Sequence, residues 1–275
     1  MMEFFEALVD PHGQFLRNAL LMGLIGALPF GLIGTYVVVR RISYIAAAIA
    51  HSILGGVGFA VYAQSQWGWT AFEPTYGALL AAILSALLIG WVSQRFNERE
   101  DTVIGIIWVS GMAIGLIFLA QSPGYFDPMA FLFGDILLVS DRDLWRVGIL
   151  AVLVCLICLA LSRQIIALAL DAAFAKVRGL RTGLLHYLML VLTALTIVLL
   201  VQLMGIILVV ALLTLPPAIA ATRTHTLLGM VSIAVVLNAV FIFTGLWFSY
   251  SLDWPSGPTI ILLATAVFLL VARRS

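Results

Sequence analysis

The chain has 275 residues, of which 63% are hydrophobic and only 10% are charged, and its formal net charge is +1. The charges fall almost entirely between long apolar runs, each close to the roughly 20 residues that a helix needs to cross the hydrocarbon of a bilayer. This composition excludes a water-soluble domain, and the small net charge gives no basic field for nucleic acid. We therefore expect an all-α, polytopic membrane helix bundle, in which helices satisfy the backbone polar groups.

Apolar runs bounded by charge, proline or glycine predict nine membrane spans, with eight as the alternative. The alternative arises because residues 184–221 are interrupted only at Gln202 and Gly205 and carry Pro216-Pro217 near their end. This stretch could form two spans, or one span and a broken segment. The predicted spans are Phe15–Val39, Ile42–Ala63, Tyr76–Val92, Val103–Ala120, Leu144–Leu161, Leu184–Val201, Leu203–Ala221, Leu227–Tyr250 and Thr259–Ala272.

No stretch between these spans is long enough to build its own core, so residues 1–275 are predicted to form a single transmembrane domain. Met1 to Gln14 contain three acidic residues and no Lys or Arg, which is not typical of a cleaved signal peptide. The first apolar run is therefore expected to be a retained span.

Lys and Arg are distributed unevenly across the nine spans, with eleven on one side and three on the other. Because cytoplasmic loops carry the excess of basic residues, the N-terminus is predicted outside and the C-terminus in the cytoplasm. Outside, the apolar segment Met129–Val139 predicts a short interfacial or re-entrant helix. Ser140 and Asp143, just before the fifth span, have the spacing of a capping box.

The sequence lacks the residues that several classes of protein function require. The sole lysine, Lys176, follows no glycine-rich loop, so a Walker A motif is excluded and any ATP must be hydrolysed by another polypeptide. None of the thirteen Asp and Glu residues lies well inside a predicted span, which disfavours a proton- or sodium-coupled carrier. An intramembrane enzyme would need a His/Glu cluster, a Ser–Lys pair or paired carboxylates there. We expect no catalytic residues and no bound cofactor.

One ionisable side chain, His51, does lie well inside a span. Neutral imidazole is a good ligand for zinc-like and manganese-like cations. An intramembrane polar group marks a functional site by default, although a neighbouring carbonyl or Ser52 could also satisfy the ring. The small residues around it, and Gly111 and Gly115 in the fourth span, allow close helix approach.

The longest cytoplasmic loop, residues 163–183, contains a second candidate site. The run from Asp171 to Gly179 predicts a short amphipathic helix that ends at a glycine, with Phe174 and Val177 on one face. Such a helix could dock onto a partner subunit or lie on the lipid surface, and periodicity alone does not separate the two.

Five segments in order resemble the permease subunits of ABC transporters for zinc, manganese and iron. Each motif is weak, being mostly Gly, Pro and apolar residues, but their order and membrane sides make the resemblance specific over nearly the whole chain. The segments are Arg40-Arg41-Ile42-Ser43-Tyr44, Leu132-Phe133-Gly134-Asp135-Ile136-Leu137, Asp171–Gly179, Ala211-Leu212-Leu213-Thr214-Leu215-Pro216-Pro217-Ala218 and Asp253-Trp254-Pro255-Ser256-Gly257-Pro258.

The resemblance implies a multi-pass protein of the bacterial cytoplasmic membrane that imports divalent metal ions. Its implied partners are a cytoplasmic ATP-binding subunit, an extracytoplasmic metal-binding protein and a second permease copy, identical or related. Asp171, Phe174, Ala175 and Gly179 are then expected to couple the chain to the ATPase.

In such permeases the histidine that matches His51 commonly has an aspartate four residues earlier, which would form a two-ligand site. Here that position is Ala47, so His51 alone is the candidate contact for the transported ion. An ABC permease for a metal chelate or another small solute would explain the missing carboxylate, and a carrier without ATP stays as a further alternative.

Overall fold

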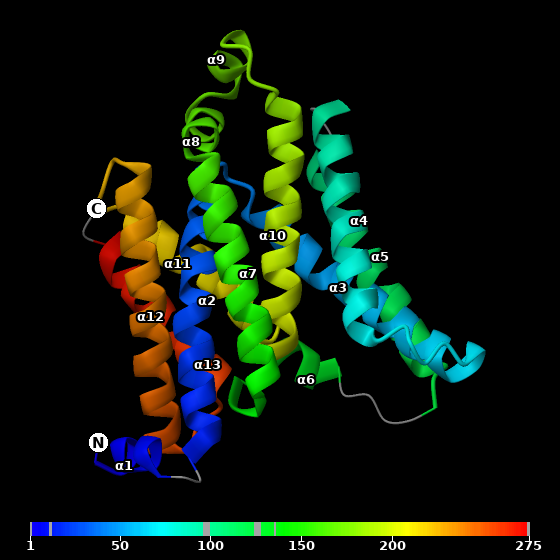
Figure 1. Ribbon diagram of the computed structural model, residues 1–275, viewed down its shortest axis with the longest axis vertical. Coiled ribbons are helices and arrows are strands. Elements are labelled where there is room, and N and C mark those ends of the chain that lie inside the picture. The colour runs from blue at the N-terminus through cyan, green and yellow to red at the C-terminus, as the bar shows by residue number, and fades with distance from the viewer. Residues whose placement is uncertain (1, 11–12, 96–99, 124–127, 135, 274–275) are drawn as a thin grey trace. The chain divides into compact units, whose positions relative to one another are not determined.

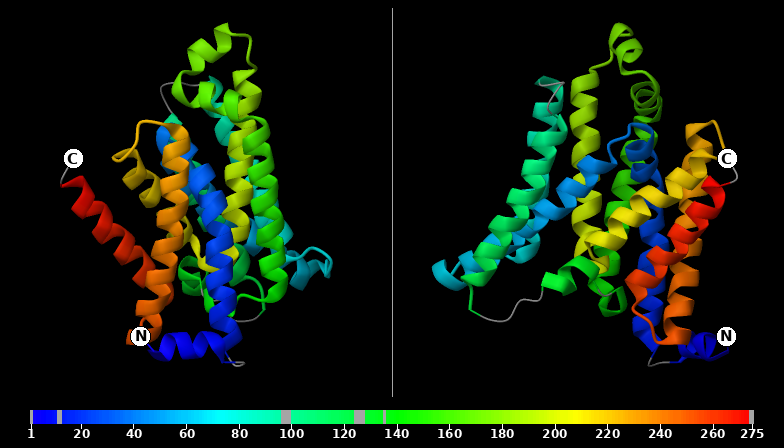
Figure 2. Two further views of the ribbon diagram at one scale, coloured as in Figure 1. Left: turned by 60° about the vertical axis from the view of Figure 1, so that its left-hand side comes forward. Right: turned by 180° about the vertical axis from the view of Figure 1, so that it is seen from behind.

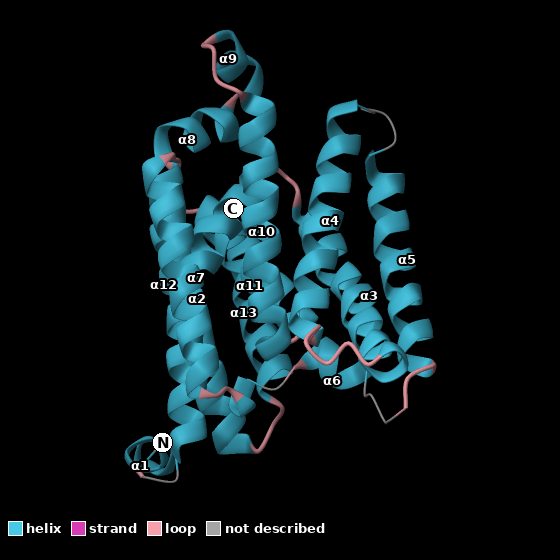
Figure 3. Cartoon of the chain, turned by 45° about the vertical axis from the view of Figure 1, so that its right-hand side comes forward, coloured by secondary structure: helices cyan, strands magenta, loops and turns pink. Residues whose placement is uncertain are grey.

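The computed structural model describes residues 2–10, 13–95, 100–123, 128–134 and 136–273. All regular structure in these ranges is helical, as Figures 1 and 3 show, which confirms the predicted all-α class. The elements are α1 Met2–Val9, α2 Gln14–Val39, α3 Ser43–Trp67, α4 Pro74–Arg95, α5 Glu100–Ala120, α6 Pro128–Phe133, η2 Ile136–Leu138, α7 Asp141–Ala160, α8 Ser162–Leu170, α9 Ala172–Val177, α10 Thr182–Met204, α11 Ile206–Ala221, α12 Leu227–Leu252 and α13 Ser256–Ala272.

Seven of the described helices are long and apolar enough to cross a membrane: α2, α3, α4, α5, α7, α10 and α12. The other two predicted spans correspond to the shorter apolar helices α11 and α13. At 1.5 Å per residue these two helices extend about 24 and 26 Å, less than the roughly 30 Å of hydrocarbon. The number of apolar helices therefore agrees with the sequence, while full crossing by α11 and α13 stays a prediction.

The chain divides into two compact units, described separately here. In the first unit, residues 1–40, 129–166 and 199–275, α2 is the central helix and contacts α1, α7, α11, α12 and η2. Figure 1 shows α2 alongside α7 and α12, and both views of Figure 2 show α1 at the N-terminal end of α2. The expectation of one domain over 1–275 stays a prediction.

Helix α2 packs closely because glycines face its neighbours. A Cβ at Gly31 would collide with Val235 of α12, and one at Gly34 would collide with the Leu213 carbonyl of α11. Pro217 has no N–H to donate to that carbonyl, so α2 approaches closely at a backbone oxygen that lacks the usual donor four residues later in α11. Glycine and proline thus act together at this contact.

A single residue interrupts the helical structure between α10 and α11. Gly205 has φ 80° and ψ 159°, a conformation that is essentially restricted to glycine. Its backbone lies directly against Gly134, which also has a positive φ of 62°, and a Cβ on either residue would meet the other segment's backbone. The segment Met129–Val139 forms α6 and η2 rather than one helix, and Asp135 lies outside the described residues.

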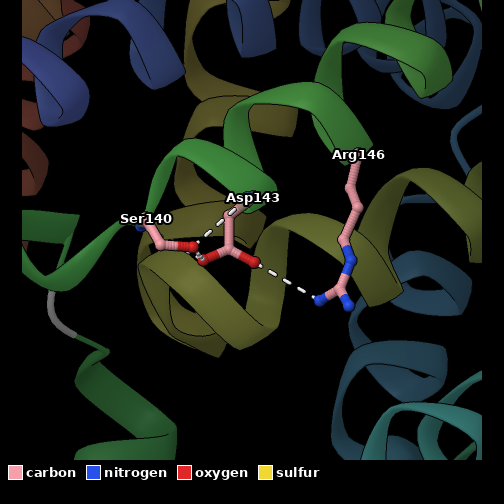
Figure 4. A network of polar contacts seen from close by, with 3 residues as sticks. All are labelled: Ser140, Asp143 and Arg146. Carbon is pink, nitrogen blue, oxygen red and sulfur yellow. Dashed lines mark hydrogen bonds and ion pairs between the residues drawn. The ribbon is translucent and has the colours of Figure 1, made fainter.

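The predicted capping box at the start of α7 is present (Figure 4). The backbone N–H of Asp143 donates to Ser140 Oγ at 3.4 Å, and the backbone N–H of Ser140 donates to Asp143 Oδ2 at 3.2 Å. Arg146 extends the network through an ion pair with Asp143 at 3.4 Å. The exchange gives side-chain acceptors to two backbone N–H groups at the start of the helix, in addition to the bond from the Asp143 N–H to the Ser140 carbonyl at 3.0 Å.

The second unit comprises residues 41–128 and 167–198, and in it α3 lies between α4 and α5 (Figure 3). Facing glycines set both contacts. Gly55 and Gly58 of α3 lie against the backbones of Gly111 and Gly115 of α5. On the other side Gly56 lies against Gly77 of α4, which confirms the predicted role of these small residues in close helix approach.

We predict that Gly56→Ala destabilises the permease. The added Cβ would collide with the Gly77 carbonyl and lie 2.7 Å from the Ala81 methyl, and overpacking of this kind costs about 1–3 kcal/mol. The measurement is the midpoint of thermal unfolding in detergent. Gly148→Ala is the matched control, because nothing lies within 4 Å of a Cβ there and alanine favours the helix. Equal midpoints for the two variants would contradict the prediction.

Candidate functional site

The candidate ion contact lies on one face of α3. Tyr44, Ala47 and His51 recur at spacings of three and four, so they share this face. Tyr44 is exposed, whereas Ala47 and His51 are half-buried. The methyl group of Ala47 supplies no ligand atom, so His51 is the one imidazole of this face and its candidate metal ligand.

The imidazole of His51 is held by an aromatic ring of α5. It stacks on Trp108 with ring centroids 4.4 Å apart and planes 15° from parallel. The same indole contacts Tyr44 at a centroid distance of 5.6 Å. Sequence reasoning missed Trp108, because one tryptophan in an apolar span is indistinguishable from a packing or lipid-facing residue.

The hydrogen bond to Ser52 that the sequence left open is absent within the described part of the chain. Ser52 Oγ instead donates to the Ile49 carbonyl at 2.8 Å. The buried Nδ1 of His51 has no hydrogen-bond partner among the described residues. A ring nitrogen with no protein partner keeps its capacity to donate a proton or to bind a cation.

The described residues bring no three His, Cys, Asp or Glu side chains together in a cluster that could hold a metal ion. One imidazole leaves most coordination positions of a divalent ion to water, to other neutral oxygens or to another chain. Within the described residues the second unit therefore offers one candidate imidazole rather than a closed set of metal ligands.

A cavity of about 390 Å³ lies between α3, α4 and α5, but His51 does not line it. Its walls are leucines, isoleucines and phenylalanines, and glycines form much of the rest. Two of its three serines, Ser52 and Ser110, already donate to backbone carbonyls at 2.8 and 2.6 Å. An apolar lining of this kind does not provide a binding site for an ion.

The predicted amphipathic helix of the loop 163–183, which is expected on the cytoplasmic side, is α9. Asp171 caps its start, since Oδ1 accepts the Phe174 N–H at 2.9 Å. Its end is a Schellman motif: Gly179 has φ 82°, its N–H donates to the Lys176 carbonyl, and the Leu180 N–H donates to the Ala175 carbonyl. Both ends of this short helix are therefore specified by the local sequence.

The two faces of α9 differ sharply. Ala175 is fully buried, whereas Phe174 and Val177 are 53% and 87% exposed. The Arg178 guanidinium lies 5.0 Å from the centroid of the Phe174 ring, which extends the apolar surface with a cation–π contact. The preceding helix α8, Ser162–Leu170, was not predicted; it occupies sequence that was expected to be loop.

The helices, the buried small-residue contacts and the intramembrane histidine define a multi-pass membrane protein. Residues 12–274 match the ABC 3 transport family, and the chain belongs to this family. The family is one of transport permeases, in agreement with the expectation that the chain is a transport subunit.

Relatives cover most of the chain. The chain is 42% identical to a probable metal transport system membrane protein of Chlamydia pneumoniae over 234 residues, which cover 85% of this chain and 80% of the relative. It is 34% identical over 269 residues to the manganese transport system membrane protein MntC of Listeria innocua, covering 98% of this chain and 93% of the relative.

A solved structure gives the same fold. The chain superposes on a chain of PsaBC from Streptococcus pneumoniae, determined in complex with Fab, with a TM-score of 0.85 and 29% identity. The match covers 98% of this chain and 94% of that chain. The predicted permease fold is thereby confirmed.

Proposed function

We propose that the chain is the membrane-spanning permease of an ATP-driven transporter that imports divalent transition-metal ions such as zinc, manganese or iron. The observation that carries the proposal is the match to the ABC 3 transport family over residues 12–274. Relatives named for metal and manganese transport, which align over most of their own length, support the substrate class.

Energy for transport comes, in this proposal, from a cytoplasmic ATP-binding subunit, because the sequence has no phosphate-binding loop of its own. Two permease copies, identical or related, form the pathway, and an extracytoplasmic metal-binding protein delivers the ion. Binding and hydrolysis of ATP move the permease between outward-facing and inward-facing states. Exposed α9 supports a role in transmitting this change, with Asp171 and Gly179 fixing its ends and Phe174 contacting the ATPase.

The ion itself is substrate and passes His51. The imidazole replaces one water of the ion's hydration shell, while the remaining ligands are neutral oxygens. A single contact of this kind gives a cation a polar binding site within the bilayer from which it can still dissociate. Selective passage requires binding that is weak enough to be reversed.

A metal chelate is the second candidate substrate, favoured by the methyl group at Ala47 where a carboxylate would strengthen the binding of a bare ion. A chelate brings its own ligands, so it needs little coordination from the protein. Competition between free Mn²⁺ and chelated iron for uptake separates the two candidates.

The test of the function is transport by the reconstituted complex. Permease, ATP-binding subunit and metal-binding protein in vesicles should accumulate radioactive Mn²⁺ or Zn²⁺ only with ATP. Equal accumulation without nucleotide would favour a carrier, and no metal transport with an intact, ATP-hydrolysing complex would overturn the proposal.

We predict that Phe174→Asp abolishes co-purification of the ATP-binding subunit. The substitution places a charge in the exposed apolar face of α9, where one aromatic anchor contributes at most a few kcal/mol to an interface, about the energy that decides assembly. The measurement is the subunit ratio after affinity purification. Leu138→Asp is the matched control, because Leu138 is 80% exposed in η2, on the opposite side of the predicted topology. An unchanged ratio for Phe174→Asp would contradict the docking role.

We predict that a cysteine near the N-terminus reacts with an impermeant maleimide from outside and that one near the C-terminus does not. Val9→Cys suits the first position because Val9 is 83% exposed, and Arg273→Cys, at the end of α13, suits the second. Gly13 is unsuitable, since a side chain there would collide with the Ala7 carbonyl. Cys155 and Cys158, which are free thiols, are first replaced by alanine. The reverse labelling pattern would overturn the orientation.

We predict that His51→Ala stops metal uptake while leaving thermal stability and assembly unchanged. The variant removes the one imidazole of the α3 face, so the ion loses its protein ligand. The measurement is ATP-driven uptake in vesicles. His225→Ala, in the exposed loop before α12, is the control for loss of a histidine elsewhere. A full uptake rate and an unchanged metal preference for His51→Ala would remove His51 from the pathway.

A further inference from the structure

Trp108 is placed on α5 by the glycines on either side of it. Gly105 and Gly111 lie three residues before and after it, on the side of α5 that faces α3. A Cβ at Gly105 would lie 3.3 Å from the Tyr44 hydroxyl, and one at Gly111 would lie 2.7 Å from the Ser52 Cα. The indole therefore has the Tyr44 side chain packed close to α5 on one side and the α3 backbone on the other, which holds this large side chain in a defined place.

The indole lies along the turn of α3 that carries Ala47. This follows because its ring contacts both Tyr44 and His51, which are two helical turns apart on the same face. The small side chain of Ala47 leaves space for the ring. The stack with His51 is close to parallel, at 15°, so the indole lies against one face of the imidazole and not at the ring edge that carries its nitrogens.

A histidine that ligates a metal is usually oriented by a hydrogen bond from its second ring nitrogen to a carboxylate, a carbonyl or water. The Nδ1 of His51 has no such partner among the described residues. Here the ring plane is fixed by the face of Trp108 instead. Stacking restricts the rotation of the imidazole without occupying the in-plane lone pair of its unprotonated nitrogen.

We propose that Trp108 is a positioning residue that holds the imidazole of His51 in the plane required to contact the transported ion. The proposal rests on the proposed function, since it requires His51 to be an ion contact. It assigns Trp108 no direct contact with the ion.

Three variants of α5 test the proposal in the reconstituted complex. Trp108→Phe keeps an aromatic face, Trp108→Leu removes it, and Phe118→Leu is the matched control. Phe118 lies on the same helix and packs against Phe59 and Tyr62 of α3 at centroid distances of 5.5 and 5.2 Å, so its loss removes aromatic α3–α5 contacts away from His51.

Trp108→Leu should raise the KM of ATP-driven Mn²⁺ or Zn²⁺ uptake about three- to tenfold, the change that loss of one aromatic stack corresponds to. Trp108→Phe should restore most of the affinity, and Phe118→Leu should leave KM unchanged. An unchanged KM for Trp108→Leu, or a rise equal to that of Phe118→Leu, would overturn the proposal.

The stack itself has a readout that does not depend on transport. In permease with isotope-labelled histidine, the ring protons of His51, assigned by their loss in His51→Ala, should be shifted upfield by the indole in the unchanged protein. They should return toward ordinary positions in Trp108→Leu only. Ring protons at ordinary positions in the unchanged protein would overturn the proposal.

The two proposals fail in different ways. If His51→Ala blocks uptake while Trp108→Leu is silent, the ion contact stands and the positioning role is overturned. If His51→Ala transports at the full rate, the ion contact fails, and the positioning role fails with it even where the NMR shift shows the stack.

Discussion

The close approach of helix backbones at facing glycines is the contact on which the rest of this structure depends. Lipid offers no hydrophobic force between helices, so their association needs dense van der Waals packing. Gly55 and Gly58 supply it between α3 and α5, and Gly56 and Gly77 supply it between α3 and α4. Larger residues at these positions would separate the helices, and the ring of Trp108 would no longer lie on His51.

The lipid surroundings also explain where the backbone is irregular. A bilayer leaves unpaired N–H and C=O groups unsatisfied, so breaks in helices occur where protein covers them. At Gly205 the covering segment is the backbone around Gly134, and at the Leu213 carbonyl it is α2 at Gly34. Both places carry glycines or prolines that were visible in the sequence, although α11 continues as a helix through its prolines, and the segments that cover them lie far away along the chain.

The spans, the capping box at Ser140 and the ends of α9 could be predicted because each depends on local sequence. Hydropathy sets a span, and a cap requires residues three or four apart. The helices α1 and α8 were missed because they are short, and their apolar stretches are far below the length of a membrane span. Trp108 was missed for a different reason: His51 and Trp108 are 57 positions apart, and only the packing of α3 on α5 brings the two rings together.

The proposed pathway, with one imidazole as its protein ligand, suits transport better than storage. Each further anionic ligand would hold a divalent ion more tightly and slow its release, whereas conduction needs a site that is easily entered and easily left. His51 beside Ala47 gives a neutral ligand with no carboxylate on the same face. Selectivity must then depend on how accurately that ligand is placed, because a single contact cannot discriminate by ligand number. In our proposal the stacked indole of Trp108 supplies that accuracy without adding charge.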